Sequence, residues 1–234
     1  MRDLFSKRSE NRAIYQAVIF DLDGTLLDSN DLHVAAWDEA FRHFGKHFPM
    51  EELRKQIGKG SDQYLPEFLS PDELSKLGKP IDEYRSALFR KKYLPLVKPF
   101  PKVRELFERI RADGKRIALA TSSHEEDVKT YTELAGIDGL FDSQVTADEA
   151  GESKPAPDVF QKALDKLKLS GDQAIAVGDT RFDVEAAKKI GLQTIGLLCG
   201  RAADAETLRK AGAMAVYKDP ADLLASYDGS PLAG

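Results

Sequence analysis

Two aspartates, Asp21 and Asp23, directly follow the apolar run of residues 17–20. Side chains two apart in a strand point the same way, so these carboxylates are expected side by side at the mouth of a buried strand. Two carboxylates that close repel each other unless a cation or a shared proton relieves them. The pair therefore indicates a cation site or acid–base chemistry, although Asp-x-Asp-Gly also occurs in surface turns.

Three later segments place polar residues where apolar runs end. Thr121 ends one run, Lys154 lies in a loop stiffened by prolines, and Asp179 and Asp183 follow a further run. Taken singly, Thr121 could be a helix cap, Lys154 a solvated lysine, and Asp183 a complement to a helix dipole. Because open α/β sheets bind ligands at the carboxyl edge of their strands, we expect these side chains to meet there.

Four carboxylates at one edge, those of Asp21, Asp23, Asp179 and Asp183, require a compensating cation. An all-oxygen ligand set favours Mg²⁺, which prefers a few carboxylates together with water and phosphate oxygens. A site that holds Mg²⁺, a lysine, a hydroxyl and backbone amides suits a phosphoryl group. The sequence thus predicts a Mg²⁺-dependent phosphoryl-transfer site.

The elements that must position these residues alternate between short apolar runs and helical patterns. This alternation predicts an α/β fold with a parallel sheet. The predicted strands are residues 17–20, 116–120, 143–146, 174–177, 194–198 and 213–217, and the helices between them include 102–112, 157–167 and 183–190.

One stretch breaks the alternation, because residues 30–97 contain helical patterns and no convincing strand. Prolines at 95, 99 and 101 mark the return of the chain. We therefore expect a core of residues 14–29 and 98–225, a helical cap of residues 30–97, and loosely ordered termini at 1–13 and 226–234. Within the cap, the expected helices are 31–44, 51–57, 72–77 and 81–93.

The motif Asp21-Leu22-Asp23-Gly24-Thr25, Thr121, Lys154-Pro155 and the segment 178–183 stand in the order of four motifs of the haloacid dehalogenase superfamily. The chain resembles that superfamily over nearly its whole length. Its insertion resembles the α-helical cap of the phosphoglycolate phosphatase and β-phosphoglucomutase subgroup. The resemblance implies a Rossmann-like, doubly wound parallel sheet with an inserted helical cap domain.

The resemblance also implies roles for the acidic residues. Asp21 is expected to attack phosphorus as the nucleophile and form an aspartyl-phosphate. Asp23 is expected to protonate the leaving oxygen and then deprotonate the hydrolytic water. Mg²⁺ would be held by the Asp21 carboxylate, the Asp23 main-chain carbonyl and Asp179. Asp183 would act through a bound water or by orienting its neighbours.

Phosphoryl contacts are implied for Thr121 and Lys154, and a substrate contact for the neighbouring Ser122. Dehalogenases of the superfamily lack the second aspartate of the first motif, so Asp23 favours phosphoryl transfer over dehalogenation. The expected enzyme is a phosphatase acting on a small phosphorylated metabolite, such as a sugar phosphate or phosphoglycolate.

Specificity is expected to come from the cap. His33 and Trp37 lie four apart on one helix face and match a His-x-x-x-Trp pair of β-phosphoglucomutase and related sugar phosphatases. Lys59 lies in a glycine-containing loop that could close over substrate. A hexose-phosphate mutase is the alternative, but Asp62 or a neighbour stands where that mutase has the arginine that binds the second phosphate. Lys59 and Lys55 are the cations that could take its place.

Composition limits the partners and the cellular location that the sequence predicts. The formal net charge of −5 argues against nucleic acid as a partner. The single cysteine and the absence of a signal-like or long apolar segment predict a cytoplasmic protein with no membrane span. A phospho-aspartate signalling module or a silent binding module is the alternative from another class, and a monomer or weak homodimer is expected.

Overall fold

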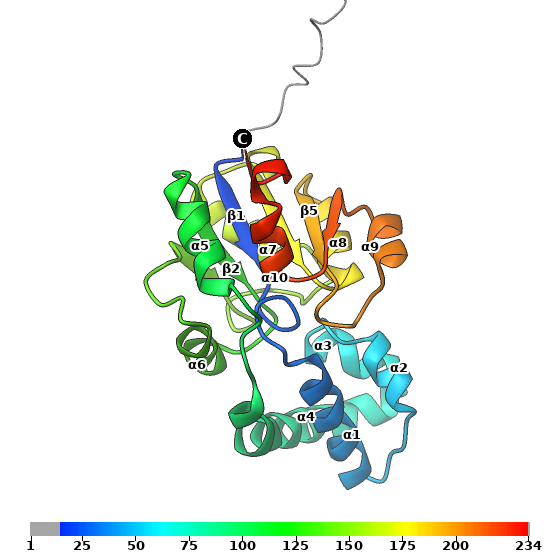
Figure 1. The fold of residues 1–234 in the computed structure, drawn as a ribbon. Coiled ribbons are helices and arrows are strands. Elements are labelled where there is room, and N and C mark those ends of the chain that lie inside the picture. The colour runs from blue at the N-terminus through cyan, green and yellow to red at the C-terminus, as the bar shows by residue number, and fades with distance from the viewer. Residues whose placement is uncertain (1–14, 234) are drawn as a thin grey trace, which may run out of the picture.

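The computed structural model describes residues 15–233. Six strands form one parallel sheet in the order β3-β2-β1-β4-β5-β6, so the first strand lies inside the sheet and later strands extend first one side and then the other (Figure 1). This arrangement confirms the predicted α/β fold. The strands are β1 (Ala17–Phe20), β2 (Arg116–Ala120), β3 (Ser143–Val145), β4 (Ala174–Gly178), β5 (Gln193–Leu197) and β6 (Ala215–Tyr217).

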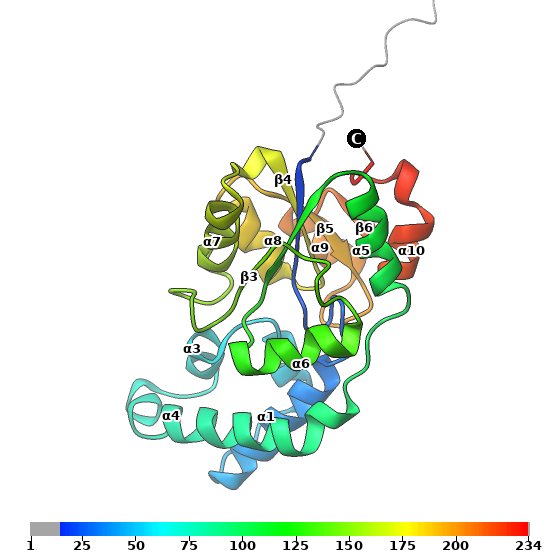
Figure 2. The same cartoon turned by 90° about the vertical axis from the view of Figure 1, so that its left-hand side faces the viewer.

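Helices cover both faces of the sheet (Figure 2). In β1, Val18 and Phe20 face one apolar core, whereas Ala17 and Ile19 face a second apolar core on the other side of the sheet. Both faces of β1 are therefore buried, which explains its uninterrupted apolar sequence. The core helices are α5 (Val103–Ala112), α6 (Glu125–Ala135), α7 (Asp158–Leu167), α8 (Arg181–Lys188), α9 (Ala205–Ala211) and α10 (Pro220–Ala225), with short turns η4 (Gly171–Gln173) and η5 (Tyr227–Gly229).

Between β1 and β2 the chain forms a helical insertion below the sheet in Figure 1. The insertion has its own apolar core, in which the Trp37 and Tyr64 rings stack with centroids 4.5 Å apart. Its elements are α1 (Asn30–His43), α2 (Met50–Lys55), α3 (Ser61–Tyr64), η1 (Leu65–Glu67), α4 (Pro71–Leu88), η2 (Phe89–Tyr93) and η3 (Leu94–Leu96).

The expectation of two separate helices at 72–77 and 81–93 is wrong. Helix α4 runs continuously for 18 residues with Pro80 in its interior, and a π-helical turn, η2, extends it. A capping box between Ser70 and Glu73 starts the helix, and the fully buried Ile81 anchors it in the core of the insertion. This packing outweighs the backbone hydrogen bond that Pro80 removes. Neither α4 nor any other described helix is long and apolar enough to cross a membrane.

The segment 226–233 is not loosely held, contrary to expectation. Tyr227 and Leu232 are buried in the core that contains α5, and the guanidinium of Arg109 lies over the Tyr227 ring. The polar and turn-forming residues around Tyr227 and Leu232 led to the expectation of a loosely ordered segment. The predicted loose ordering of residues 1–13 lies outside the described residues.

Candidate active site

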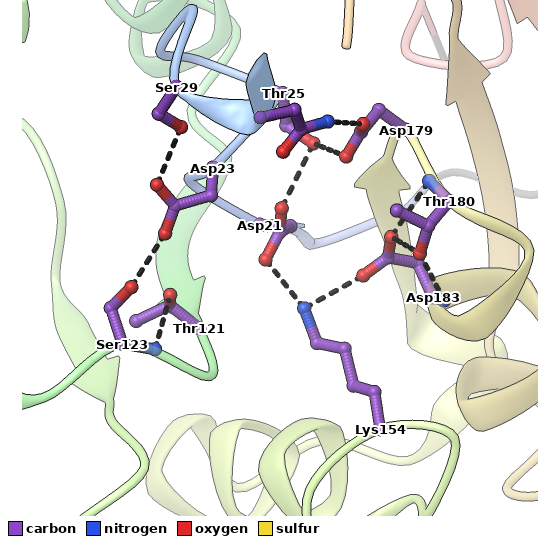
Figure 3. A network of polar contacts seen from close by, with 11 residues as sticks. Asp21, Asp23, Thr25, Ser29, Thr121, Ser123, Lys154, Asp179, Thr180 and Asp183 are labelled. Atoms are coloured by element: carbon purple, nitrogen blue, oxygen red, sulfur yellow. Dashed lines mark hydrogen bonds and ion pairs between the residues drawn. The ribbon is translucent and has the colours of Figure 1, made fainter. Parts of the chain in front are cut away.

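The strand ends bring the candidate residues together. Asp21, Thr121 and Asp179 directly follow β1, β2 and β4, which are neighbours in the sheet, and Lys154 approaches from the loop before α7 (Figure 3). Asp183 lies in the first turn of α8. The sequence prediction that these side chains meet at one edge agrees with this placement.

Lys154 forms the centre of a buried ion-pair cluster. Its Nζ lies 2.6 Å from Oδ1 of Asp21 and 2.7 Å from Oδ1 of Asp183. Burial alone would lower the pKa of Lys154, but the two carboxylates raise it above its ordinary value. Burial raises the pKa of Asp21 to about 7; the charge of Lys154 opposes this shift and that of Asp183 adds to it. Lys154 is therefore a fixed positive charge beside Asp21.

Asp179 is held by neutral donors. The Thr25 hydroxyl lies 3.1 Å from both Oδ2 of Asp21 and Oδ1 of Asp179, and can donate its single proton to only one of them at a time. The Asn30 amide donates to Oδ2 of Asp179 at 2.7 Å. Burial and the charges of Asp183 and Asp21 raise the pKa of Asp179 well above its usual value.

The donor set fits a divalent cation. Asp21, Asp179 and Asp183 each offer a carboxylate oxygen, and these atoms lie within 4.8 Å of one another. Lys154 pairs with two of the three carboxylates, while no cationic side chain of residues 15–233 forms an ion pair with Asp179. Three buried carboxylates beside one ammonium leave an excess of negative charge, and oxygen ligands suit Mg²⁺.

Asp23 lies near enough to Asp21 for its charge to raise the pKa of Asp21, but it has polar partners of its own. Its carboxylate accepts hydrogen bonds from Ser29 and Ser123, each at 2.6 Å, and lies 2.8 Å from Nε2 of His33. Burial alone would raise the pKa of Asp23, but the His33 imidazole and the two hydroxyls lower it far below its ordinary value. The two aspartates thus have separate partners and different protonation behaviour.

The cap supplies the environment of His33. Arg85 donates to Nδ1 of His33 at 2.6 Å, so the proton of a neutral ring lies on Nε2 and is directed at Asp23. Burial lowers the pKa of His33, which favours this neutral form. The ring stacks on Phe89, and the Arg85 guanidinium lies 4.8 Å from the centre of the Trp37 ring. His33 and Trp37 therefore belong to one polar and aromatic group facing the catalytic edge.

A pocket of about 250 Å³ separates the cap from this edge. The buried Ser122 hydroxyl has no hydrogen-bond partner among the described residues and is available to a ligand. The Thr121 hydroxyl accepts a hydrogen bond from the Ser123 amide at 3.0 Å. The predicted site residues that line the pocket are Asp21, Asp23, Thr121 and Ser122 from the core and His33, Trp37 and Lys59 from the insertion.

Lys59 lies on the pocket wall, but its ammonium group already forms an ion pair. Its ammonium pairs with Glu67 at 2.7 Å and lies 4.9 Å from the centre of the Phe182 ring. In the same loop, the Asp62 carboxylate accepts a hydrogen bond from the Ser153 amide of the core at 3.0 Å. The loop therefore joins the insertion to the core, and Lys59 does not offer a free cation to the pocket.

Sequence reasoning missed several residues that complete the site. Thr25 and Ser29 belong to or closely follow the first aspartate motif, and Ser123 follows Thr121, so their proximity in sequence was an available signal. Asn30 shares this proximity, but proximity does not indicate its partner Asp179. Arg85 carried no such signal, because its contact with His33 depends on how the helices of the insertion pack together.

The family model for haloacid dehalogenase-like hydrolases matches residues 18–197. The chain belongs to this family. A phosphorylated carbohydrates phosphatase of Thermotoga maritima is 28% identical to this hydrolase over 213 residues, which cover 89% of this chain and 96% of the relative. A phosphoglycolate phosphatase of Aquifex aeolicus is 33% identical over 194 residues, covering 79% and 85%. The crystal structure of a hydrolase from Pseudomonas syringae matches with a TM-score of 0.81 and 29% identity, covering 92% of this chain and 98% of that one.

Proposed function

We propose that this hydrolase is a Mg²⁺-dependent phosphomonoesterase that acts on a small phosphorylated metabolite through an aspartyl-phosphate on Asp21. The observation that carries the proposal is the position of Asp21 on the pocket wall, with Lys154 on one carboxylate oxygen and Asp179 close by without an ion-pair partner in residues 15–233. The names of the two phosphatase relatives support a sugar phosphate or phosphoglycolate as the substrate.

In the first half-reaction, an oxygen of Asp21 attacks phosphorus in line with the leaving oxygen. The new bond joins Asp21 to phosphorus, the ester P–O bond breaks, and Asp23 gives its proton to the leaving oxygen. In the second half-reaction, Asp23 takes a proton from water, and that water attacks phosphorus. The bond to Asp21 then breaks, which releases inorganic phosphate and restores both aspartates.

Lys154, Thr121 and Ser122 are assigned to the phosphoryl oxygens. The carboxylates of Asp21 and Asp179 and the main-chain carbonyl of Asp23 would hold Mg²⁺, with Asp183 orienting Lys154. When bound, Mg²⁺ would supply positive charge that offsets the negative charges of Asp21 and the phosphoryl group. Lys154 adds a second positive charge at the same carboxylate, which reduces repulsion between two anionic partners.

The contacts of Asp23 bear on its two proposed roles, as the acid of the first half-reaction and the base of the second. Three polar neighbours, Ser29, Ser123 and His33, favour its ionised form in the arrangement described here. That form is the base required for the second half-reaction. To act as the acid, the carboxyl group must exchange at least one of these contacts for the leaving oxygen, which lowers the preference for the ionised form.

A β-phosphoglucomutase-like reaction is the second candidate. Such a reaction requires a cationic group for the phosphate that is not reacting, and Glu67 already neutralises Lys59. Arg85 is the observation in favour of this candidate, because it lines the pocket from the insertion and forms an ion pair with none of the described carboxylates. Interconversion of β-glucose 1-phosphate and glucose 6-phosphate with a bisphosphate activator would reveal this activity.

The test is phosphate release from sugar phosphates, phosphoglycolate and nucleotides, with Mg²⁺ or with excess chelator. We expect Mg²⁺-dependent release by the parent protein and none by Asp21→Asn. Borohydride reduction during turnover should convert the acyl phosphate at Asp21 into homoserine, which peptide mass spectrometry detects. Release that continues in Asp21→Asn would contradict the proposal, and no release or mutase activity on any substrate would favour a binding or signalling module.

A further inference from the structure

We propose that Asn30, the first residue of the cap helix α1, is a positioning residue that makes Mg²⁺ affinity depend on how the start of the cap is held against the core. The inference rests on the proposed function for the identity of the ion. It assigns to a cap residue a role in the metal site, whereas the motif residues all come from the core.

The side chain of Asn30 leaves its own helix and enters the core. It is almost completely buried, and its amide donates to Oδ2 of Asp179 at 2.7 Å and to the Gly200 carbonyl at 2.9 Å. The amide oxygen is buried without a partner among the described residues. Asn30 therefore orients Asp179, the carboxylate that has no ion-pair partner within residues 15–233. The unpaired amide oxygen of Asn30 can accept a hydrogen bond from water held in the site with the ion.

Two glycines make room for this contact. A Cβ on Gly24, whose φ is +74°, would lie 2.2 Å from the Asn30 amide nitrogen and 2.3 Å from Oδ2 of Asp179. A Cβ on Gly200 would lie 1.8 Å from the same oxygen of Asp179. Two separate loops thus lack side chains where Asn30 meets Asp179, so the backbone of both loops is shaped around this pair.

Two aspartates that flank Asn30 form ion pairs with the core loop that contains Gly200. Arg201, directly after Gly200, binds Asp28 at 2.7 Å and Asp31 at 2.9 Å through its guanidinium. We call this group of Arg201, Asp28 and Asp31 the hinge clasp. Because Asn30 lies between the two aspartates, loosening the hinge clasp would let the Asn30 amide move away from Asp179.

A link between Mg²⁺ binding and the position of α1 must be reciprocal. If the clasped position of α1 improves Mg²⁺ binding through Asn30, bound Mg²⁺ must favour the clasped position by the same factor. Thr25 provides a matched comparison, because its hydroxyl also reaches Asp179 but comes from the core loop that carries Asp21. Loss of Thr25 should weaken the ion site without removing its dependence on the hinge clasp.

The experiment measures the Mg²⁺ dissociation constant by titration calorimetry in two double-mutant cycles. We expect Asn30→Ala to weaken binding by about tenfold, as is typical when a group that orients a metal ligand is lost. Arg201→Met should weaken Mg²⁺ binding severalfold in the parent protein and have no effect in Asn30→Ala. In Thr25→Val, Arg201→Met should retain its full effect.

Either of two results would overturn the inference: unchanged Mg²⁺ affinity in Asn30→Ala, or an Arg201→Met effect as large in Asn30→Ala as in the parent. Thermal unfolding verifies that each variant is folded, and Asn30→Ser replaces Asn30→Ala if the latter is not. A parent that binds no Mg²⁺ would overturn both this inference and the proposed metal. Coupled Mg²⁺ binding without phosphate release would refute only the proposed reaction.

Discussion

At the scale of single residues, substitution of Asp21 and of Asp23 should affect different parts of the proposed reaction. If Asp23 is the proton donor, as proposed, Asp23→Asn should lower the rate on alkyl phosphates by about 10²–10⁴-fold. The rate on p-nitrophenyl phosphate should fall much less in the first step, because its leaving group needs no proton. Pre-steady-state bursts of nitrophenol measure that step, and Asp21→Asn, the control, should abolish the burst.

Equal losses on both substrates in Asp23→Asn would contradict the assignment of Asp23 as the leaving-group acid. In that case its contacts with Ser29, Ser123 and His33 would serve to arrange the site.

The pH dependence of stability follows from the raised pKa of Asp21. Without Mg²⁺, the folded protein keeps a proton on Asp21 that the unfolded chain releases above its ordinary pKa of 3.8, so this group's contribution to stability falls as pH rises from there to about 7. Mg²⁺ requires the deprotonated carboxylate, so the rise in melting temperature caused by Mg²⁺ should be larger at about pH 7.5 than at about pH 5.5. A rise independent of pH would contradict this linkage.

The buried Lys154 should contribute strongly to the stability of the metal-free protein. Lys154→Met leaves Asp21 and Asp183 without their shared cation, and breaking a buried pair costs about 3–5 kcal/mol. Urea unfolding in excess chelator measures the loss. Lys102→Met, which removes an exposed lysine paired with Glu105, should leave stability almost unchanged. A similar small effect for both substitutions would contradict this prediction. It would show that Asp21 and Asp183 lose their unpaired negative charge by taking up protons.

At the scale of elements, α4 carries an internal proline that its packing tolerates. Pro80→Ala restores the missing backbone donor and should raise the free energy of unfolding by up to about 3 kcal/mol, measured by urea unfolding. Pro71→Ala, in the first turn of the same helix, is the control and should have little effect. No gain for Pro80→Ala would mean that the helix is already bent to fit the proline.

The elements also show what the sequence could and could not reveal. Strand ends and motif order predicted the meeting of Asp21, Lys154 and Asp179, because parallel strands fix where their carboxyl ends lie. The predicted break between residues 77 and 81 does not occur, since a local sequence pattern does not take account of tertiary packing such as the burial of Ile81. The contact of Asn30 with Asp179 could not be predicted, because it joins two segments whose relative position is set by the whole fold.

At the scale of the whole molecule, the insertion contacts the core on both sides of the pocket. Besides the contact of Asp62 with Ser153, Arg90 binds Asp127 at 2.9 Å and Glu126 at 2.8 Å. The insertion has an apolar core of its own, but its residues Ala36, Phe89 and Tyr93 also pack into the main core. The polar contacts add to this apolar junction, so their release should loosen the insertion without unfolding either part.

The double variant Asp62→Ala/Arg90→Met should therefore loosen the cap. Small-angle scattering should show a larger radius of gyration for this variant than for the parent when neither is liganded. Mg²⁺ with beryllium fluoride, a phosphoryl mimic, should reduce the difference by closing the pocket. Lys55→Met, which removes an exposed cap lysine paired within the cap, is the control. Identical scattering profiles for parent and double variant would show that these contacts do not hold the cap.

The central place of β1 also has a consequence for how the protein is made. Its two neighbours, β2 and β4, begin at Arg116 and Ala174, so β1 leaves the ribosome long before either partner exists. The helical insertion emerges in between, with an apolar core of its own that can assemble during synthesis. Throughout that interval β1 is an unpaired apolar segment of the kind that is prone to aggregate until its partner strands are made.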